Sequence, residues 1–313
     1  MSKNRTHRLR TAALGTGLVA GALAIYSRWA GRQAEAAVPA DGRFIDVDGA
    51  RLHYVDRGTG PAIVLVHGLG GQLRNFSYAL LDLLTPHHRV ILIDRPRSGY
   101  STAAAGTEPG IVDQAGIIAR AIEKLGLEKP LLVGHSLGGA ISLALALDDP
   151  DAVRALALIA PLTQPLEKVP PVFRGLQART RLSRTITARV LGVPLGQLTS
   201  LAVVKQVFAP EPVPADFGTR GGGALALRPG NLNAASFEIS SANAEMTKLS
   251  RRYHELKLPV SILFGREDHV LDHHLNGVVT TEHIAQATLD LIDGGHMLPV
   301  TQPARTAEFI RAA

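Results

Sequence analysis

Short apolar runs alternate with stretches of helical period along the chain from residue 43 onward. Six runs have the length and the flanking glycine, proline or charged residues of buried parallel strands, at 62–66, 90–94, 131–133, 155–159, 261–264 and 288–292. Helical periods lie between them, notably at 111–125, 140–147 and 304–310. Two earlier strand candidates, 44–47 and 51–56, flank Asp48-Gly49, which is typical of a hairpin. The pattern predicts an α/β domain with a mostly parallel sheet.

One region interrupts this alternation. Proline-rich stretches enclose a helical pattern at 174–204, and no strand candidate of comparable quality follows until Val260. We therefore expect a helical cap insertion at 162–255. The remaining segments, 36–161 and 256–313, would then form the α/β core.

The N-terminal segment combines basic residues with an apolar run. Residues 11–27 carry no charge, and Tyr26 and Trp29 lie at the end of the run, where amphipathic aromatic side chains favour a membrane interface. A helix needs about 20 apolar residues to cross a bilayer, and the minimum is about 17. We expect 1–35 to be an uncleaved, single-pass signal-anchor. A secretory signal cleaved at Ala34-Glu35-Ala36 and a soluble tail are the alternatives.

The orientation of this anchor follows from its flanking charges. Four basic residues precede the apolar run and two follow it, so the positive-inside rule places residue 1 in the cytoplasm. The rest of the chain would then be extracytoplasmic, which means periplasmic in a bacterium.

The composition excludes several classes of protein. The chain of 313 residues is 46% hydrophobic and 19% charged, which is ordinary for a protein that forms a core. It contains no cysteine, and this excludes disulfides, Cys zinc sites and a Cys nucleophile. Only 4% of its residues are aromatic, so we expect no stacking surface for nucleic acid and no nucleic-acid partner.

The net charge of +6 is concentrated in two segments. Residues 1–35 have a net charge of +5 and residues 161–208 one of +6, so the remainder is acidic. The second segment has arginines at helix-like intervals among apolar residues: Arg174, Arg179, Arg181, Arg184 and Arg189. This pattern fits a cap helix that lies on an anionic membrane surface. A solvated basic helix face is the alternative.

A candidate nucleophile lies between a strand candidate and a helical stretch. Gly134-His135-Ser136-Leu137-Gly138 follows the run at 131–133 and precedes the helix at 140–147. In such a strained strand-to-helix turn the serine hydroxyl is exposed at the carboxyl edge of the sheet, and the flanking glycines allow close backbone approach. The following helix directs its positive N-terminal end toward the reacting centre.

A second glycine-rich turn, His67-Gly68-Leu69-Gly70-Gly71, follows the strand candidate at 62–66. A tetrahedral acyl intermediate carries an oxyanion that needs preorganised donors, and the backbone N–H groups of Leu69 and Leu137 are candidates for this oxyanion hole. The Leu69 side chain is then a candidate pocket wall. A plain strand-to-helix connection is the alternative for this turn.

A serine nucleophile needs a base and an orienting acid. His296 follows the last strand candidate, and Asp268 follows the strand candidate at 261–264. The order Ser136, Asp268, His296 is the serine, acid, base order of one known architecture. Glu267 and Asp272 are close enough in sequence to compete with Asp268 for the acid role.

With these motifs the chain resembles the α/β-hydrolase fold superfamily, and in particular its serine hydrolases with a helical cap. The matching residues are His67-Gly68-Leu69-Gly70, the turn from Asp94 to Ser101, Gly134-His135-Ser136-Leu137-Gly138, Gly265 with Asp268, and Gly295-His296. They span about 43–313. The resemblance implies a mostly parallel eight-stranded sheet with helices on both faces and an inserted helical cap. One departure is Arg97, where the family has glycine. We interpret it as a surface charge, with a partner for a substrate carboxylate as the alternative.

The resemblance also implies an activity. A Ser136-Asp268-His296 triad with Leu69 and Leu137 as oxyanion donors would hydrolyse carboxylic esters through an acyl-enzyme, without a metal or a cofactor. The substrate would be a small-molecule ester, lipid-derived if the cap lies on a membrane. A C–C bond or lactone hydrolase would use the same triad, and a catalytically silent ligand-binding protein is an alternative of a different class. Serine in place of an aspartate nucleophile disfavours epoxide and haloalkane hydrolysis.

Overall fold

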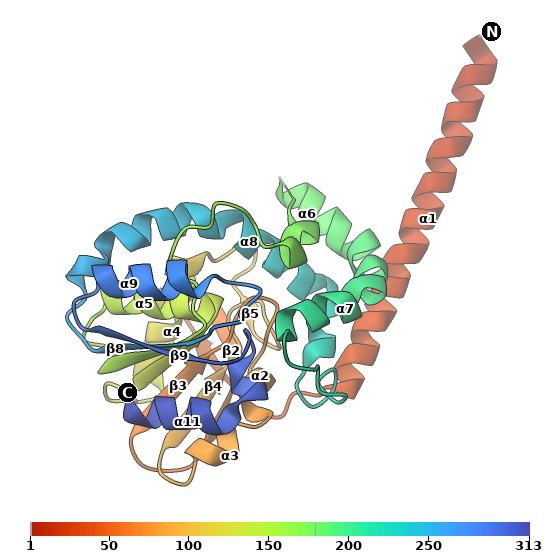
Figure 1. Ribbon diagram of the computed structural model, residues 1–313. Coiled ribbons are helices and arrows are strands. Elements are labelled where there is room, and N and C mark those ends of the chain that lie inside the picture. The colour runs from red at the N-terminus through yellow and green to blue at the C-terminus, as the bar shows by residue number, and fades with distance from the viewer. Residues whose placement is uncertain (1, 179) are drawn as a thin grey trace.

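A single sheet lies at the centre of the molecule (Figure 1). The computed structural model describes residues 2–178 and 180–313, and side chains from residue 15 onward except those of 16 and 179. Within these residues nine strands are present: β1 (Arg43–Val47), β2 (Ala50–Arg57), β3 (Ala62–Val66), β4 (Arg89–Ile93), β5 (Thr102–Ala103), β6 (Leu131–His135), β7 (Ala155–Ile159), β8 (Val260–Gly265) and β9 (Ala287–Ile292).

The strand order confirms the predicted fold class. Eight strands follow the order β1-β2-β4-β3-β6-β7-β8-β9, and the short β5 pairs with β2 in the described part of the chain. Strands β1, β2 and β4 pair antiparallel, and β1 and β2 form the hairpin predicted around Asp48-Gly49. All pairs from β4 through β3, β6, β7 and β8 to β9 are parallel.

Helices cover both faces of the sheet. Val64 and Leu132 pack on one face with α4 and α5, whereas their strand neighbours Leu65 and Leu131 pack on the other face with α2, α3 and α11. This division follows from the alternation of side chains along a strand. The bounds of the helices in the core are α2 (Arg74–Ser77), α3 (Leu81–Leu84), α4 (Ile111–Lys124), α5 (Leu137–Asp148), η5 (His274–Val278), α9 (Val279–His283), α10 (Leu298–Thr301) and α11 (Pro303–Ala312).

A helical region separates β7 from β8. Its elements are η1 (Pro171–Leu176), α6 (Arg181–Thr187), the π-helical turn η2 (Ala188–Gly192), α7 (Val193–Phe208), η3 (Gly223–Leu227), α8 (Pro229–Leu249) and η4 (Ser250–Glu255). The helix predicted over 174–204 is therefore interrupted, because Arg174 belongs to η1 and the longer helix begins only at Arg181. Arg179 lies outside the described residues. The sequence pattern did not single out α8.

The arginines of this region do not form one exposed basic face. Arg184 is buried, and its Nη2 lies 2.7 Å from Glu108 Oε2. Arg181 Nε and Arg97 Nη1 approach the same carboxylate at 4.0 and 3.6 Å. Arg97 also donates to Asn233 Oδ1 of α8 at 2.5 Å and is partly buried, so it is not a free surface charge. Desolvation lowers the pKa of the Arg97 guanidinium.

The N-terminal helix α1 (Ser2–Ala37) continues well past the predicted apolar run. Its N-terminal part projects away from the rest of the molecule, whereas its C-terminal part lies against α7 (Figure 1). Tyr26 Oη donates to Gln197 Oε1 of α7 at 2.6 Å, and Glu35 pairs with Arg228 at 2.7 Å. Directly after the helix, the Val38 carbonyl accepts a hydrogen bond from Tyr100 Oη at 2.5 Å.

One stretch of the described residues is long and apolar enough to cross a membrane, judged by length and composition alone. It is the 28-residue helical stretch Arg181–Phe208, and most of it is not buried. The structure does not describe the side chains at the start of the predicted membrane segment, 11–30. It also does not describe the side chains of the basic residues before this segment: Lys3, Arg5, Arg8 and Arg10.

Candidate active site

Ser136 occupies a strained turn between β6 and α5. Its φ of 55° and ψ of −120° lie in a region that residues other than glycine rarely adopt. The turn is fixed on both sides, because Ser136 N donates to Ile159 O at 3.1 Å and Leu162 N donates to Ser136 O at 2.9 Å. Strain that the surrounding structure holds in place is characteristic of functional sites. The arrangement is the strand-turn-helix predicted for the nucleophile.

Glycines permit the close packing of this turn. A Cβ atom on Gly138 would lie 2.1 Å from the carbonyl oxygen of Val66, and one on Gly68 would lie 2.8 Å from Ser136 Cβ. Side chains at these positions would separate the two glycine-rich turns. The loop after β3 and the start of α5 therefore meet at Ser136.

Asp268 and His296 form a buried pair at the same edge of the sheet. Asp268 Oδ2 lies 2.7 Å from His296 Nδ1, and the two side chains are 0% and 4% exposed. The other oxygen, Oδ1, accepts hydrogen bonds from the backbone N–H groups of Val270 and Leu271 at 2.7 and 2.9 Å. A carboxylate held in this way fixes the imidazole with its proton on Nδ1, so that Nε2 can accept a proton.

The competing acids point elsewhere. Glu267 Oε2 accepts a hydrogen bond from Gly294 N at 3.0 Å, and Asp272 Oδ1 accepts one from His274 N at 2.8 Å. The geometry therefore selects Asp268 as the carboxylate that contacts His296.

His135 joins the turn at Ser136 to the loop that contains His296. Its Nε2 donates to the carbonyl oxygen of His296 at 3.0 Å, and the centres of the two imidazole rings are 5.0 Å apart. Burial, together with the nearby His296, lowers the pKa of His135 to about 3. His135 is thus a neutral imidazole that holds the His296 backbone beside the residue that precedes Ser136.

The peptide between Gly68 and Leu69 is held by three donors. The Gly68 carbonyl oxygen accepts hydrogen bonds from His67 Nδ1 at 2.9 Å, Arg95 Nη2 at 3.0 Å and Gly71 N at 3.2 Å. Since the C=O and N–H of a trans peptide point in opposite directions, these bonds also fix the direction of the Leu69 N–H. The sequence identified Leu69 but gave no sign of this support.

The tautomer of His67 follows from its contacts. Its Nε2 accepts a hydrogen bond from Arg95 N at 3.0 Å, so the ring proton must lie on Nδ1, which donates to Gly68 O. Burial, followed by the positive charge of Arg95, lowers the pKa of His67 well below its usual value. The neutral ring is therefore a fixed part of the loop.

Sequence reasoning missed the ion pair between Arg95 and Glu238. Arg95 is fully buried after β4, and its Nη1 lies 2.5 Å from Glu238 Oε1 on the cap helix α8. Gln114 of α4 completes the network, because Arg95 Nη1 donates to Gln114 Oε1 at 2.7 Å and Gln114 Nε2 donates to Glu238 Oε1 at 2.9 Å. The only signal in the sequence was the position of Arg95 directly after a strand, next to Asp94.

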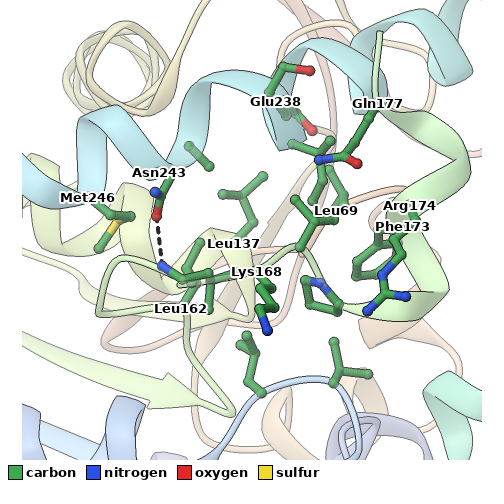
Figure 2. Close-up of a pocket in the computed structure, with 18 of the residues that line it drawn as sticks. Leu69, Leu137, Leu162, Lys168, Phe173, Arg174, Gln177, Glu238, Asn243 and Met246 are labelled. Atoms are coloured by element: carbon green, nitrogen blue, oxygen red, sulfur yellow. Dashed lines mark hydrogen bonds between the residues drawn. The ribbon is translucent and has the colours of Figure 1, made fainter.

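A cavity of about 870 Å³ adjoins Ser136, Leu69 and Leu137. Figure 2 shows Leu69 and Leu137 beside Leu162 and Phe173, with Met246 and Asn243 on the α8 side. Asn243 Oδ1 accepts a hydrogen bond from Leu166 N at 2.7 Å, drawn as the dashed line. The remaining polar lining residues include Lys168, Arg174, Gln177 and Glu238. The predicted oxyanion-hole residues and the predicted nucleophile thus border one mostly apolar space.

No group of three or more His, Asp or Glu side chains within the described part of the chain is arranged to hold a metal ion. What the site offers chemically is a hydroxyl in a strained turn, an imidazole paired with a carboxylate, and fixed backbone donors.

Comparison with known proteins extends over most of the chain. A family model described as alpha/beta hydrolase fold matches residues 61–303. The dihydrolipoyllysine-residue acetyltransferase component of the acetoin cleaving system of Cupriavidus necator is 39% identical over 122 residues, which cover 38% of this chain and 32% of that protein. The chain spans less than half the length of the first curated relatives that it matches.

Solved structures share the fold at low sequence identity. An α/β hydrolase fold protein from Burkholderia ambifaria has a TM-score of 0.72 and 21% identity, with 87% of this chain and 97% of that chain covered. A bacterial membrane phospholipase A has a TM-score of 0.67 and 21% identity, with 100% of this chain and 97% of that chain covered.

Other similar proteins are named as hydrolases of several kinds. They include haloalkane dehalogenase 2 of Mycobacterium tuberculosis, (E)-2-((N-methylformamido)methylene)succinate hydrolase of Acinetobacter baylyi and the enol-lactonase of Burkholderia xenovorans. Since the family model covers well over half of its residues, the chain belongs to the α/β-hydrolase fold family.

Proposed function

We propose that this protein is a serine hydrolase that cleaves carboxylic esters through an acyl-enzyme. Membership of the family and the names of its relatives support a hydrolase. The single observation that carries the finer proposal is the 2.7 Å contact between Asp268 and His296, at the sheet edge where the strained turn holds Ser136. A neutral serine in that position needs a base of this kind to become a nucleophile.

In the proposed first half-reaction, Ser136 Oγ attacks the ester carbonyl carbon and His296 Nε2 takes the hydroxyl proton. The imidazolium is stabilised by Asp268, and the tetrahedral intermediate collapses as its C–O bond to the alcohol breaks. His296 returns the proton to the departing alcohol oxygen. Water then attacks the acyl-enzyme with His296 again as base, and the products are a carboxylic acid and free Ser136.

The oxyanion of each tetrahedral intermediate would be stabilised by the backbone N–H groups of Leu69 and Leu137. Donors that are fixed before the reaction need no reorganisation when charge develops. The three hydrogen bonds on the Gly68 carbonyl supply this fixation for Leu69.

The cavity favours esters with a sizeable apolar acyl group. Its volume of about 870 Å³ falls in the range of small-molecule sites, and its lining includes leucine, phenylalanine and methionine side chains. Serine at the nucleophile position, where aspartate would serve for halide or epoxide chemistry, also supports acyl transfer.

We place the enzyme on a membrane through α1. The uncharged run at 11–27 is long enough to cross a bilayer, and the charge bias places the catalytic domain on the extracytoplasmic side. Sodium carbonate washing of membranes is expected to leave the full-length chain in the pellet, whereas detergent releases it. Release by salt or carbonate alone would contradict the anchor.

Replacement of the nucleophile tests the enzymatic proposal. We expect Ser136→Ala to lower the turnover of a water-soluble p-nitrophenyl ester by on the order of 10⁴-fold or more, and to abolish labelling by a fluorophosphonate probe. Ser250→Ala, a serine substitution in η4 away from the cavity, serves as the matched control and keeps both signals. Ester turnover by Ser136→Ala at the rate of the unsubstituted protein, with an unchanged circular dichroism spectrum, would refute the proposal.

A further inference from the structure

The helical stretch α6–η2–α7 exposes a row of large apolar side chains. Six of them are between 46% and 82% exposed, and we call this set the leucine face: Leu182, Ile186, Leu191, Leu195, Leu198 and Leu201. A single exposed leucine needs no explanation, but six large exposed apolar side chains on one stretch of 28 residues are the kind of cluster that marks an interaction site.

The spacing places these side chains in rows along α6 and along η2 and α7. Leu191, Leu195 and Leu198 follow the i, i+4, i+7 pattern, and Leu182 and Ile186 repeat the four-residue step on α6. The opposite side is used within the protein, where Arg184, Ala188 and Val193 are buried. The cap stretch therefore differs from the basic surface helix that the arginine spacing suggested. Leucines, and not arginines, dominate its exposed side.

The leucine face adjoins α1. Helix α1 contacts both η2 and α7, and the Tyr26 hydroxyl donates to Gln197 of α7. On α1 itself Leu18, Ile25 and Trp29 are more than half exposed. The exposed apolar side chains of the cap and of the predicted anchor thus belong to helices that contact each other, near the predicted interfacial residues Tyr26 and Trp29.

The charges in this region suit anionic lipid headgroups. Residues 181–208 contain four basic residues and no aspartate or glutamate, and Arg189 and Lys205 are exposed. On α1, Arg28 and Arg32 are exposed just beyond the apolar run. Exposed cations beside an apolar face are the pattern of helices that lie in the interface of a bilayer.

We propose that the leucine face docks in the interfacial region of the bilayer that α1 spans, and that this docking presents the active-site cavity to lipid esters of the membrane. The cavity lining supports the second part, because Phe173, Arg174 and Gln177 lie directly before α6 and border the cavity. The substrate class, an acyl ester embedded in the membrane, rests on the proposed serine hydrolase function. The docking does not rest on the hydrolase function, but it does rest on the proposed membrane anchor.

Site-specific fluorescence tests the docking. The chain has no cysteine, so Leu198→Cys can be labelled at a single site with an environment-sensitive NBD group in the full-length protein. In vesicles of phosphatidylethanolamine and phosphatidylglycerol, we expect doxyl-labelled lipids to quench this label. Leu83→Cys, an exposed leucine on α3 of the core, is the matched control and should not be quenched. Equal quenching at the two positions would overturn the proposal. The proposal would also be overturned if a second copy of the chain shielded the label at position 198 and the doxyl-labelled lipids did not quench it.

A kinetic comparison tests the substrate class. In the same vesicles, replacing Leu195, Leu198 and Leu201 together by asparagine is expected to lower the hydrolysis of a bilayer-embedded acyl ester by at least about tenfold, the factor that corresponds to transfer of one leucine side chain. Hydrolysis of the soluble p-nitrophenyl ester should not change. Equal loss on both substrates would refute a role in lipid presentation. If the unsubstituted chain did not hydrolyse the soluble ester, the catalytic proposal would be refuted. The quenching result would still decide the docking.

Discussion

Glu238 of the cap helix α8 and Arg95 of the loop after β4 form a buried ion pair, with 2.5 Å between Oε1 and Nη1. The same guanidinium donates through Nη2 to the Gly68 carbonyl, whose peptide carries the Leu69 N–H. The cap is therefore connected through one side chain to the proposed oxyanion hole. The position of the cap helix and the direction of the proposed oxyanion donor are therefore mechanically linked.

This connection predicts a split effect at Glu238. Glu238→Gln keeps an acceptor for Arg95 but removes the charge that fixes it, so we expect kcat for a soluble ester to fall by about tenfold with a smaller change in KM. Glu238→Ala leaves the buried Arg95 unpaired and is expected to lower the free energy of unfolding by about 3–5 kcal/mol. Steady-state kinetics and chemical denaturation measure the two effects.

The control for this pair is an ion pair of similar length at the surface. Asp151 lies 2.7 Å from Lys129, with both side chains mostly exposed, and Asp151→Asn should change neither kcat nor stability measurably. A wild-type kcat in Glu238→Gln would show that the ion pair does not position the oxyanion donor.

The proposed acid, Asp268, makes a sharper prediction. Asp268→Asn would place an amide against His296 Nδ1 and favour the wrong imidazole tautomer, so we expect kcat to fall by on the order of 10³–10⁴-fold. Asp272→Asn, four residues later in the same loop region, is the control and should keep nearly full activity. Within the described residues, the Asp272 carboxylate accepts a hydrogen bond from His274 N alone. If the two variants had equal activity, Asp268 would not be the catalytic acid.

Gly138 is predicted to tolerate no side chain. The Cβ of Gly138→Ala would meet the Val66 carbonyl oxygen at 2.1 Å, a backbone atom that cannot move without displacing β3. We expect a loss of about 3 kcal/mol in the free energy of unfolding together with a large loss of activity. Gly116→Ala in the middle of α4 meets only the end of the Arg120 side chain, at 3.4 Å, and should stabilise the protein by about 0.5–1 kcal/mol. Thermal and denaturant unfolding of both variants distinguish these outcomes.

Acidification should destabilise the protein through His135. The unfolded chain binds a proton at this residue near the usual pKa of 6.5, whereas the folded protein holds the pKa at about 3. Stability from this group is therefore complete above pH 6.5 and declines as the pH falls toward about 3, by about 2 kcal/mol at about pH 5. Denaturation curves between about pH 7 and about pH 5 measure the decline. A smaller decline in His135→Gln is expected, and an unchanged decline would contradict this assignment.

The core could be predicted from local patterns with close bounds. Strands β3 and β7 begin and end at the predicted residues, because a parallel strand buried on both faces is a continuous apolar run bounded by turn residues. The loops at the carboxyl ends of the strands then place Ser136, Asp268 and His296 at one edge. Short-range sequence signals were sufficient to place these residues because each lies within four residues of the end of a strand.

The support of the site could not be predicted in the same way. Glu238 is 143 residues from Arg95, and neither periodicity nor motif connects them. No motif singles out His53 of β2, which is buried with its Nδ1 2.8 Å from Asp94 Oδ2. In the cap, the short elements η1 and α6 have weak apolar periods, and their ends depend on packing against α8. Contacts between distant segments fix these features.

The continuity of α1 with the domain would limit how the proposed membrane-anchored hydrolase searches for substrate. Because no unstructured linker separates the helix from the Val38 and Tyr100 contact, a bilayer-anchored molecule could not swing its active site away from the membrane. Its encounters would be restricted to molecules that diffuse laterally in the plane of the lipid. The frequency of these encounters would depend on the number of substrate molecules per unit area of membrane. Dilution of the surrounding aqueous phase would then leave the rate unchanged.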